Sequence, residues 1–116
     1  MSDWRERLEP LEVEPLASGA LALHHARAFN ARRRGLAKLD ALPADVGLHI
    51  HRCSSVHTFG MRFGLDLIWL GREGIVRVDR GVPPRRQRLC LRAKSVVEVA
   101  EGGADRWVGA LTSSHV

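Results

Sequence analysis

Residues 64–80 constrain the fold most, because two largely apolar runs flank a short turn that contains two glycines. The first run is GLDLIWL (64–70) and the second is IVRVDR (75–80). Between them lies GREG, in which Gly71 and Gly74 offer the backbone freedom that a tight turn requires. This pattern predicts a β-hairpin, and with it an antiparallel pair of strands.

Other short segments have the alternation or the apolar content that is typical of strands. They are ALALHHAR (20–27), GLHIHRCSSV (47–56), RLCLRA (88–93) and SVVEVA (95–100). The prolines of VPPRRQ interrupt the chain before the third of these segments, because proline cannot donate to a strand ladder. The chain therefore predicts five or six short strands.

Helical patterns are fewer. One longer helix is predicted from about Ala28 to Leu39, where apolar residues recur at helical spacing around an interior glycine, and a final helical turn near EGGADRWVGAL is expected to pack Trp107 against the core. Many strands with one main helix indicate a β-rich α+β domain. In so short a chain we expect a small closed or strongly curled, barrel-like sheet, because closure removes exposed strand edges.

The 116 residues suffice for one domain with a single core. Residues 1–17 are expected to form an acidic N-terminal tail, and residues 18–116 the single β-rich domain. No apolar run approaches the roughly 20 residues of a membrane-spanning helix, and the charged N-terminus lacks the apolar segment of a secretory signal. We therefore expect a cytoplasmic protein without a membrane partner, in which Cys53 and Cys90 are free thiols.

The net charge of +5 is unevenly distributed. Residues 1–15 carry a net charge of −3, so the remainder carries +8. A basic body attracts phosphates, nucleic acid or an acidic partner, although 16 arginines among the 18 basic residues also fit the codon bias of a GC-rich genome. The arginines that would form an anion-binding surface are Arg32, Arg33, Arg34, Arg77, Arg80, Arg85, Arg86, Arg88 and Arg92.

A metal site is suggested by His49, His51 and Cys53, which alternate and would share one face of a strand. Zinc needs three or four ligands at about 2.0–2.3 Å, and a straight strand cannot bring all three side chains to one ion. Either further ligands come from elsewhere in the chain, or the histidines lie singly on a half-exposed sheet face. The other possible ligands are His57, Cys90, His24 and His25.

Asp66 is the single charged residue in GLDLIWL, and a buried carboxylate must be ion-paired or hydrogen-bonded. Arg52 and Arg62 are the nearby candidates for a structural ion pair. A general base is the alternative, because unusual carboxylates cluster at functional sites. Neither cysteine lies in a redox pair or in the signature of a helix N-terminus, so a thiol nucleophile is not favoured.

The stretch SVHTFGMRFGLDLIWLGREGIVRV (55–78) resembles the signature of domain-of-unknown-function family 192, which typically reads V-H-T-F-x-M-R-F-P-I-D. The similarity extends over roughly residues 20–108. Gly64 stands where the family usually has proline, Val99 and Ala100 replace a leucine-proline pair, and an arginine pair replaces tryptophan-arginine. The matching positions are Val56, His57, Thr58, Phe59, Met61, Arg62, Phe63, Asp66, Leu70 and Gly74.

This resemblance implies a small β-barrel-like α+β fold and brings no established reaction, substrate or cofactor. If the family shares a site, its polar candidates here are His57, Thr58, Arg62 and Asp66, with Arg62 as the anchor for a small polar or anionic group. The same residues could instead tie a loop to the barrel.

Together these observations favour a non-catalytic module, without a cofactor, that binds a small ligand or a protein partner. Nucleic acid is not the favoured partner, because the chain has no Tyr and only three Phe for base stacking. Two alternatives stay open. One is anion or nucleic-acid binding through Arg32, Arg33, Arg34, Arg85, Arg86 and Arg88. The other is a metal-dependent enzyme that uses His51, Cys53, His57 and Cys90.

Overall fold

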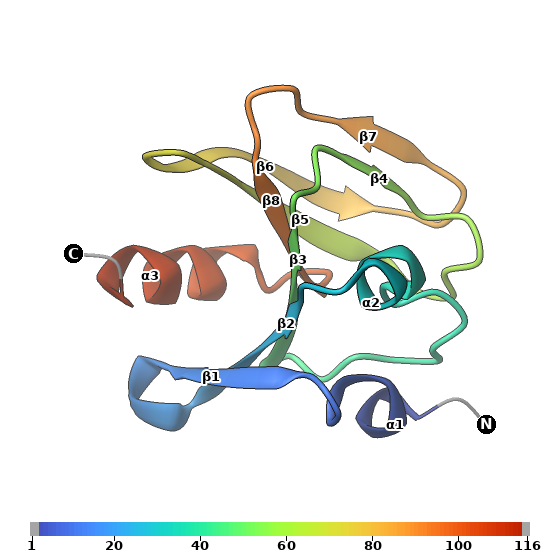
Figure 1. The fold of residues 1–116 in the computed structure, drawn as a ribbon, viewed down its shortest axis with the longest axis horizontal. Helices are drawn as coiled ribbons and strands as arrows, with labels where there is room; N and C mark the ends of the chain where they lie inside the picture. The colour runs from blue at the N-terminus through green and yellow to red at the C-terminus, as the bar shows by residue number, and fades with distance from the viewer. Residues whose placement is uncertain (1–2, 115–116) are drawn as a thin grey trace.

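The computed structural model describes residues 3–114, which form an open six-stranded sheet, a two-stranded ribbon and three α-helices (Figure 1). In chain order the elements are α1 (Trp4–Leu8), β1 (Glu12–Leu16), a 3-10 turn (Ala17–Gly19), β2 (Leu21–Ala26), α2 (Phe29–Arg34), β3 (Val46–His51), β4 (Ser55–His57), β5 (Leu65–Gly71), β6 (Gly74–Val82), β7 (Gln87–Leu89), β8 (Ser95–Ala100) and α3 (Ala104–Ser114).

The strand order in the sheet is β1–β2–β3–β8–β5–β6, with β2 and β3 parallel and the other neighbours antiparallel. The predicted hairpin is confirmed, because β5 and β6 are antiparallel and Gly71 lies opposite Gly74 at their turn. Gly74 has a φ of +128°, which residues with a side chain rarely adopt. The prediction of a β-rich α+β domain is also confirmed.

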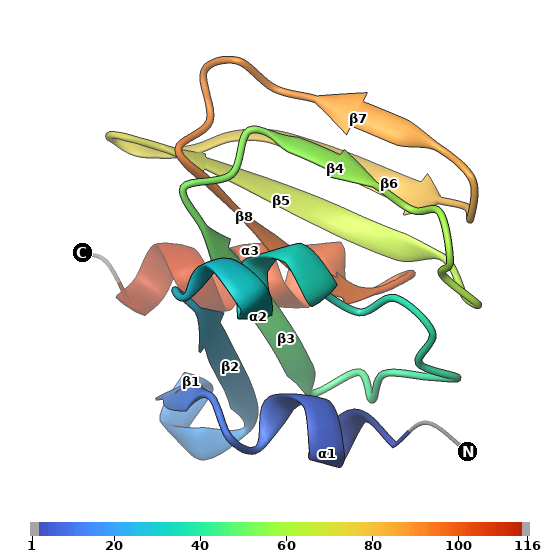
Figure 2. The same ribbon diagram turned by 45° about the vertical axis from the view of Figure 1, so that its right-hand side comes forward.

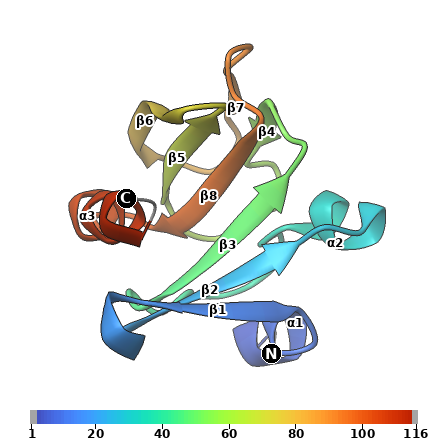
Figure 3. The ribbon, with the colours of Figure 1, turned by 60° about the vertical axis from the view of Figure 1, so that its left-hand side comes forward.

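The predicted closed or strongly curled barrel is wrong. The sheet is open, with β1 and β6 as its two edges, and β4 and β7 pair with each other instead of closing it (Figures 1 and 3). Closure is not required to bury the apolar surface, since α3 lies against one face of the sheet and α1, α2 and the β4–β7 ribbon lie on the other. Pro15 on β1 also makes that edge a poorer template for pairing.

The face towards α3 contains a buried apolar cluster to which Val97, Trp107 and Leu111 contribute. Gly47 allows Trp107 to lie directly on β3, because a Cβ at Gly47 would come within 2.9 Å of the indole ring. The Trp107 indole Nε1 donates to the carbonyl oxygen of Ala44 at 3.1 Å. The expected packing of Trp107 is therefore confirmed, within a helix of 11 residues instead of one turn.

The opposite face contains the larger buried cluster, which includes Leu48, Leu67 and Trp69 from the sheet and Val56 from the ribbon. α1 and α2 lie along this side (Figure 2), and Leu8 of α1 is completely buried. The indole Nε1 of Trp69 donates to the Asp79 carboxylate at 2.9 Å, which satisfies the polar atom of a buried aromatic ring.

The helix predicted over residues 28–39 is shorter than expected. α2 ends at Arg34 because Gly35 adopts a φ of 48° and a ψ of −133°, which breaks the helical path. The apolar residues Leu36 and Leu39 are buried, but in irregular backbone. The longest helix is α3, and none of the helices in residues 3–114 has the length and apolar character needed to span a membrane.

The segment expected to be an acidic tail is folded from residue 4 onwards, so this expectation is wrong. β1 pairs antiparallel with β2, and both Leu8 and Leu16 are buried. The acids of this segment do not prevent folding, because Glu12 forms an ion pair with Arg27 at 3.0 Å and other acids face solvent. The segment therefore supplies an edge strand of the sheet.

Candidate functional site: a polar cavity and a histidine cluster

Asp66, the buried acid of the central motif, accepts hydrogen bonds from three backbone amides and has no arginine partner among the described residues. Its Oδ1 accepts from Gly81 at 2.8 Å, and its Oδ2 accepts from Gly102 and Ala104 at 3.0 Å. The predicted ion pair with Arg52 or Arg62 is thus wrong. The carboxylate instead joins β6 to the start of α3, where a negative charge also suits the helix N-terminus.

Thr58 and Arg62 also make contacts within the chain. The Thr58 hydroxyl donates to the carbonyl oxygen of Pro83 and accepts from the Arg86 amide, both at 2.7 Å. Arg62 forms an ion pair with Asp40, and both side chains are about half exposed. These two residues hold loops in place on the side of the sheet where β4 lies.

A cavity of about 210 Å³ lies between α2 and β4, and we call it the α2–β4 cavity. Of the four polar motif residues, His57 lines it, whereas Thr58, Arg62 and Asp66 do not. The full lining comprises residues 32–37, Ile50, Cys53, residues 55–57, Phe59, Met61 and Glu98.

Glu98 is the unusual group of this cavity, because it lies on the central strand β8 with 4% of its surface exposed. Its Oε1 is buried without a hydrogen-bond partner among residues 3–114. Burial raises the pKa of this carboxyl to about 7. Gly35, at the end of α2, lies directly over the carboxyl, because a Cβ at Gly35 would be 3.7 Å from Oε1. Sequence patterns did not reveal Glu98, which resembles an ordinary polar residue in SVVEVA.

Three of the arginines predicted to bind anions, Arg32, Arg33 and Arg34, line this cavity. Arg32 donates to the carbonyl oxygens of His51 and Arg52, at 3.5 and 3.3 Å, while its Nε is buried without a hydrogen-bond partner in the described part of the chain. The other predicted arginines lie elsewhere. β7 and the loop before it contain Arg85, Arg86 and Arg88, and Arg92 follows β7. Arg77 forms an ion pair with Asp79, and Arg80 forms one with Asp105.

The predicted metal ligands do not converge as a set. Cys53 donates to the carbonyl oxygen of Ser55, Cys90 is buried in the larger apolar cluster, and His57 is exposed on β4. The expected alternation fails because β3 ends at His51, and Arg52, with a φ of 54°, turns the chain so that Cys53 packs with the cluster on the other face. Burial also raises the pKa of the Cys53 thiol, which disfavours the thiolate.

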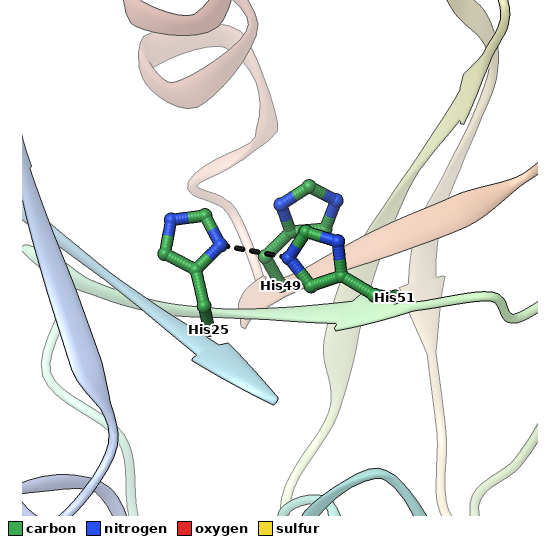
Figure 4. A group of neighbouring side chains, drawn as sticks. All are labelled: His25, His49 and His51. Atoms are coloured by element: carbon green, nitrogen blue, oxygen red, sulfur yellow. Dashed lines mark hydrogen bonds between the residues drawn. The ribbon is translucent and has the colours of Figure 1, made fainter. Parts of the chain in front are cut away.

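His51 instead joins His25 and His49 in a cluster, which is the one group of three or more potential metal ligands found among residues 3–114 (Figure 4). His25 lies opposite His49 in the parallel β2–β3 pair, and His49 and His51 alternate along β3, so all three side chains share the face that carries α3. His25 Nδ1 lies 2.8 Å from His51 Nε2. The sequence indicates His49 and His51 as metal ligands and His25 as a possible further one, but it gives no sign that β2 pairs with β3 and so brings these three together.

Hydrogen bonds from other elements hold this histidine cluster. His25 Nε2 lies 2.9 Å from the Glu14 carboxylate on β1, and His49 Nε2 lies 2.8 Å from the Ser95 hydroxyl on β8. The rings of His49 and His51 stack with centroids 3.9 Å apart. Burial, with Arg27 as the next cause, lowers the pKa of His51 to about 4, so this imidazole is neutral at pH 7.

These features define the class: a small α+β domain built on an open sheet, with a polar cavity on one face and clustered histidines on the other. The chain belongs to the DUF192 family, described as "Uncharacterized ACR, COG1430", whose profile matches residues 13–109. The resemblance of the central motif to this family is therefore confirmed. The family has no known function, and comparison with curated proteins gave no match.

Two solved structures share the fold. The first is a protein of unknown function from Novosphingobium aromaticivorans DSM 12444, with a TM-score of 0.71 and 19% identity over 85% of this chain and 80% of that one. The second, from Sinorhizobium meliloti 1021, is described as a candidate transcription regulator. Its TM-score is 0.67, with 19% identity over 82% of each chain. At this identity the similarity concerns the fold alone.

Proposed function

We propose that this chain binds a small ligand in the α2–β4 cavity, and that the ligand carries both an anionic group and a hydrogen-bond donor. The observation that supports this most is Glu98 Oε1, buried at the cavity without a hydrogen-bond partner among the described residues. An unsatisfied buried acceptor costs about 1–3 kcal/mol. A ligand that donates a hydrogen bond to this atom would offset that cost.

The arginines at the same cavity support an anionic group on the ligand. Arg32, Arg33 and Arg34 follow one another along α2, and all three line the cavity. A guanidinium group binds a carboxylate or phosphate through paired, charge-assisted hydrogen bonds. The cavity thus combines donors from α2 with an acceptor from β8, an arrangement suited to a ligand that has both kinds of group.

The size of the cavity narrows the ligand class. A volume of about 210 Å³ lies below the roughly 300–1,000 Å³ of pockets that bind drug-sized ligands. A cavity of this volume favours a ligand of the size of an amino acid or a hydroxy acid over one of the size of a nucleotide. We therefore expect a metabolite with a carboxylate and a neighbouring amine or hydroxyl.

This proposal revises the site expected from the family motif. His57 lines the cavity and can contribute to binding, whereas Thr58, Arg62 and Asp66 support the surrounding backbone. We propose binding instead of thiol chemistry, because burial raises the pKa of the Cys53 thiol in the cavity and disfavours its thiolate.

The test is a thermal-shift screen of the full chain with α-amino acids, α-hydroxy acids and inorganic phosphate, followed by calorimetric titration of the compounds that raise Tm. We expect an amino or hydroxy acid to bind wild type, to bind Arg33→Ala about tenfold more weakly and to lose measurable affinity for Glu98→Leu, which removes the acceptor and keeps an apolar side chain of similar length. The matched control is Arg72→Ala, which removes an exposed arginine from the β5–β6 turn and should bind as wild type does.

Unchanged affinity in Glu98→Leu would overturn the assignment of the cavity. Stabilisation by oligonucleotides alone, lost in moderate salt and in an Arg85→Ala/Arg86→Ala/Arg88→Ala variant, would favour the basic surface as a nucleic-acid site. In that case the ligand would be a polyanion bound outside the cavity.

A further inference from the structure

The histidine cluster of His25, His49 and His51 lies on the face of the sheet opposite the one that bears the α2–β4 cavity, so it has no part in the function proposed above. Three imidazoles from two neighbouring strands meet there, although none of the three matches the family motif (Figure 4). Such a gathering of side chains needs an explanation beyond packing, because imidazole is both polar and a common metal ligand.

We propose that His25, His49 and His51 bind one divalent transition-metal ion of the zinc type through one nitrogen each. Their candidate ligand atoms all lie within 4.8 Å of one another. Nitrogens that bind zinc at 2.0–2.1 Å in a tetrahedral site lie about 3.3 Å apart. Small rotations of the rings therefore convert the observed cluster into a coordination site, and the backbone of β2 and β3 does not have to move.

The groups behind the histidines match those around known metal sites. A metal-binding histidine usually donates its second N–H to a carboxylate, a carbonyl or a hydroxyl group, which fixes the ring orientation. Glu14 contacts Nε2 of His25 at 2.9 Å, so Nδ1 of that ring is directed towards His51. Ser95 contacts Nε2 of His49 at 2.8 Å and limits the rotation of the second ring.

The electrostatic surroundings permit a cation. Arg27 and Arg52 are the neighbouring positive charges, and Glu12 and Glu14 are the neighbouring negative ones. Arg27 is held by Glu12 at 3.0 Å, so much of its charge is compensated.

Burial indicates the kind of site. His25 is buried, whereas His49 and His51 are half-buried, so the cluster is accessible from one side. Imidazole ligands favour zinc, copper, nickel and iron over magnesium or calcium. Three protein ligands leave one tetrahedral position for water or another small ligand. The ion also links β2 to β3 and, through Glu14, to the edge strand β1.

The test uses the untagged full-length chain, stripped with a chelator and titrated with ZnCl₂ by calorimetry and with CoCl₂ by absorbance. The expected result is one equivalent of each ion and the intense visible bands of tetrahedral cobalt. His51→Gln is expected to abolish both signals. The matched control, His57→Gln, removes an exposed histidine on β4 and should bind as wild type does.

Glu14→Gln tests the supporting carboxylate, and we expect it to weaken zinc binding about 10–100-fold while keeping the stoichiometry. Glu98→Leu should leave zinc binding unchanged, which separates this site from the cavity. If His51→Gln does not fold, the site is tested in wild type by following the imidazole NMR signals during a zinc titration. Zinc must then shift the signals of His25, His49 and His51.

Three results would overturn the proposal. The first is the absence of stoichiometric binding by wild type in the micromolar range. The second is equal binding by His51→Gln. The third is zinc-dependent shifts confined to other histidines.

Discussion

At the scale of single residues, the two buried acids of the sheet differ in how their oxygens are satisfied. Asp66 accepts three backbone hydrogen bonds, whereas Oε1 of Glu98 has no partner among residues 3–114. The first arrangement stabilises the fold, and the second disfavours the charged form of the acid. This contrast is why we assign Asp66 to the architecture and Glu98 to binding.

Asp66→Ala is expected to lower the free energy of unfolding by about 3 kcal/mol, because it leaves the amides of Gly81, Gly102 and Ala104 without their acceptor. Urea unfolding followed by tryptophan fluorescence measures the change. Asp45→Ala, which removes an exposed acid before β3, is the control and should change stability little. A loss below 1 kcal/mol in Asp66→Ala would contradict the structural role.

Glu98 should make stability fall as pH rises. Its pKa is about 7 in the folded chain against an ordinary value of 4.5, so between these values the folded state binds more protons than the unfolded state. The contribution is complete below pH 4.5 and is lost as pH rises through 7, with a total on the order of 3 kcal/mol.

Urea unfolding of wild type and Glu98→Gln between pH 5 and 8 tests this linkage. The difference between their free energies of unfolding at each pH removes the contribution of the other titrating groups. We expect Glu98→Gln to gain stability relative to wild type as pH rises. Glu73→Gln, in the exposed β5–β6 turn, is the control and should follow wild type. Parallel curves for wild type and Glu98→Gln would refute the linkage.

At the scale of elements, glycines determine where α2 ends and how closely α3 approaches the sheet. Gly35 ends α2 with a backbone conformation that other residues rarely adopt, and the arginines of α2 line the same cavity as Glu98. Gly47 lets the indole ring of Trp107 contact β3 directly. A helix of 12 residues, as the apolar spacing predicts, would not leave the same cavity.

Gly35→Ala is expected to destabilise the chain by about 1–3 kcal/mol, because alanine is strained at this φ and ψ. Gly109→Ala should have the opposite effect, a gain of up to about 1 kcal/mol, since Gly109 lies inside α3 and a Cβ there meets no atom within 4 Å. Thermal unfolding compares the two variants. If both substitutions changed the stability by the same amount in the same direction, the different roles of Gly35 and Gly109 would be contradicted.

At the scale of the whole molecule, the sheet stays open because both faces are covered, and its N-terminal edge belongs to the core. Leu8 and Leu16 are buried, and β1 also supplies the Glu14 carboxylate to His25. The acidic composition of this segment suggested a tail, but a few buried leucines and the pairing with β2 outweigh that composition.

Deletion of residues 1–16 is therefore expected to cost on the order of 5 kcal/mol, as each buried leucine contributes about 2 kcal/mol or more and the ladder to β2 is lost. Because small domains are stable by only about 5–15 kcal/mol, the shortened chain should unfold at a much lower temperature. Circular dichroism melting measures this. A shortened chain that melts like wild type would show that the segment is dispensable.

Local features of this protein were accessible from the sequence. The hairpin of residues 64–80, the strand at residues 95–100 and the family motif depend on alternation, turn residues and identity within short windows. The candidate site was accessible only in part. The sequence indicates His57 and Arg32–Arg34, which line one cavity. It does not indicate Glu98, because nothing in SVVEVA distinguishes a buried acid from an exposed one.

By itself the sequence determined the β-rich class and the hairpin, because these follow from interactions between near neighbours along the chain. Only the tertiary structure decided that the sheet is open, that the N-terminal segment forms its edge and that β2 lies parallel to β3. That parallel register brings His25 to His49, and the end of α2 at Gly35 lies over Glu98, so that arginines of α2 and this acid line one cavity. Both juxtapositions join residues far apart in the chain, and they depend on which surfaces the whole molecule buries together.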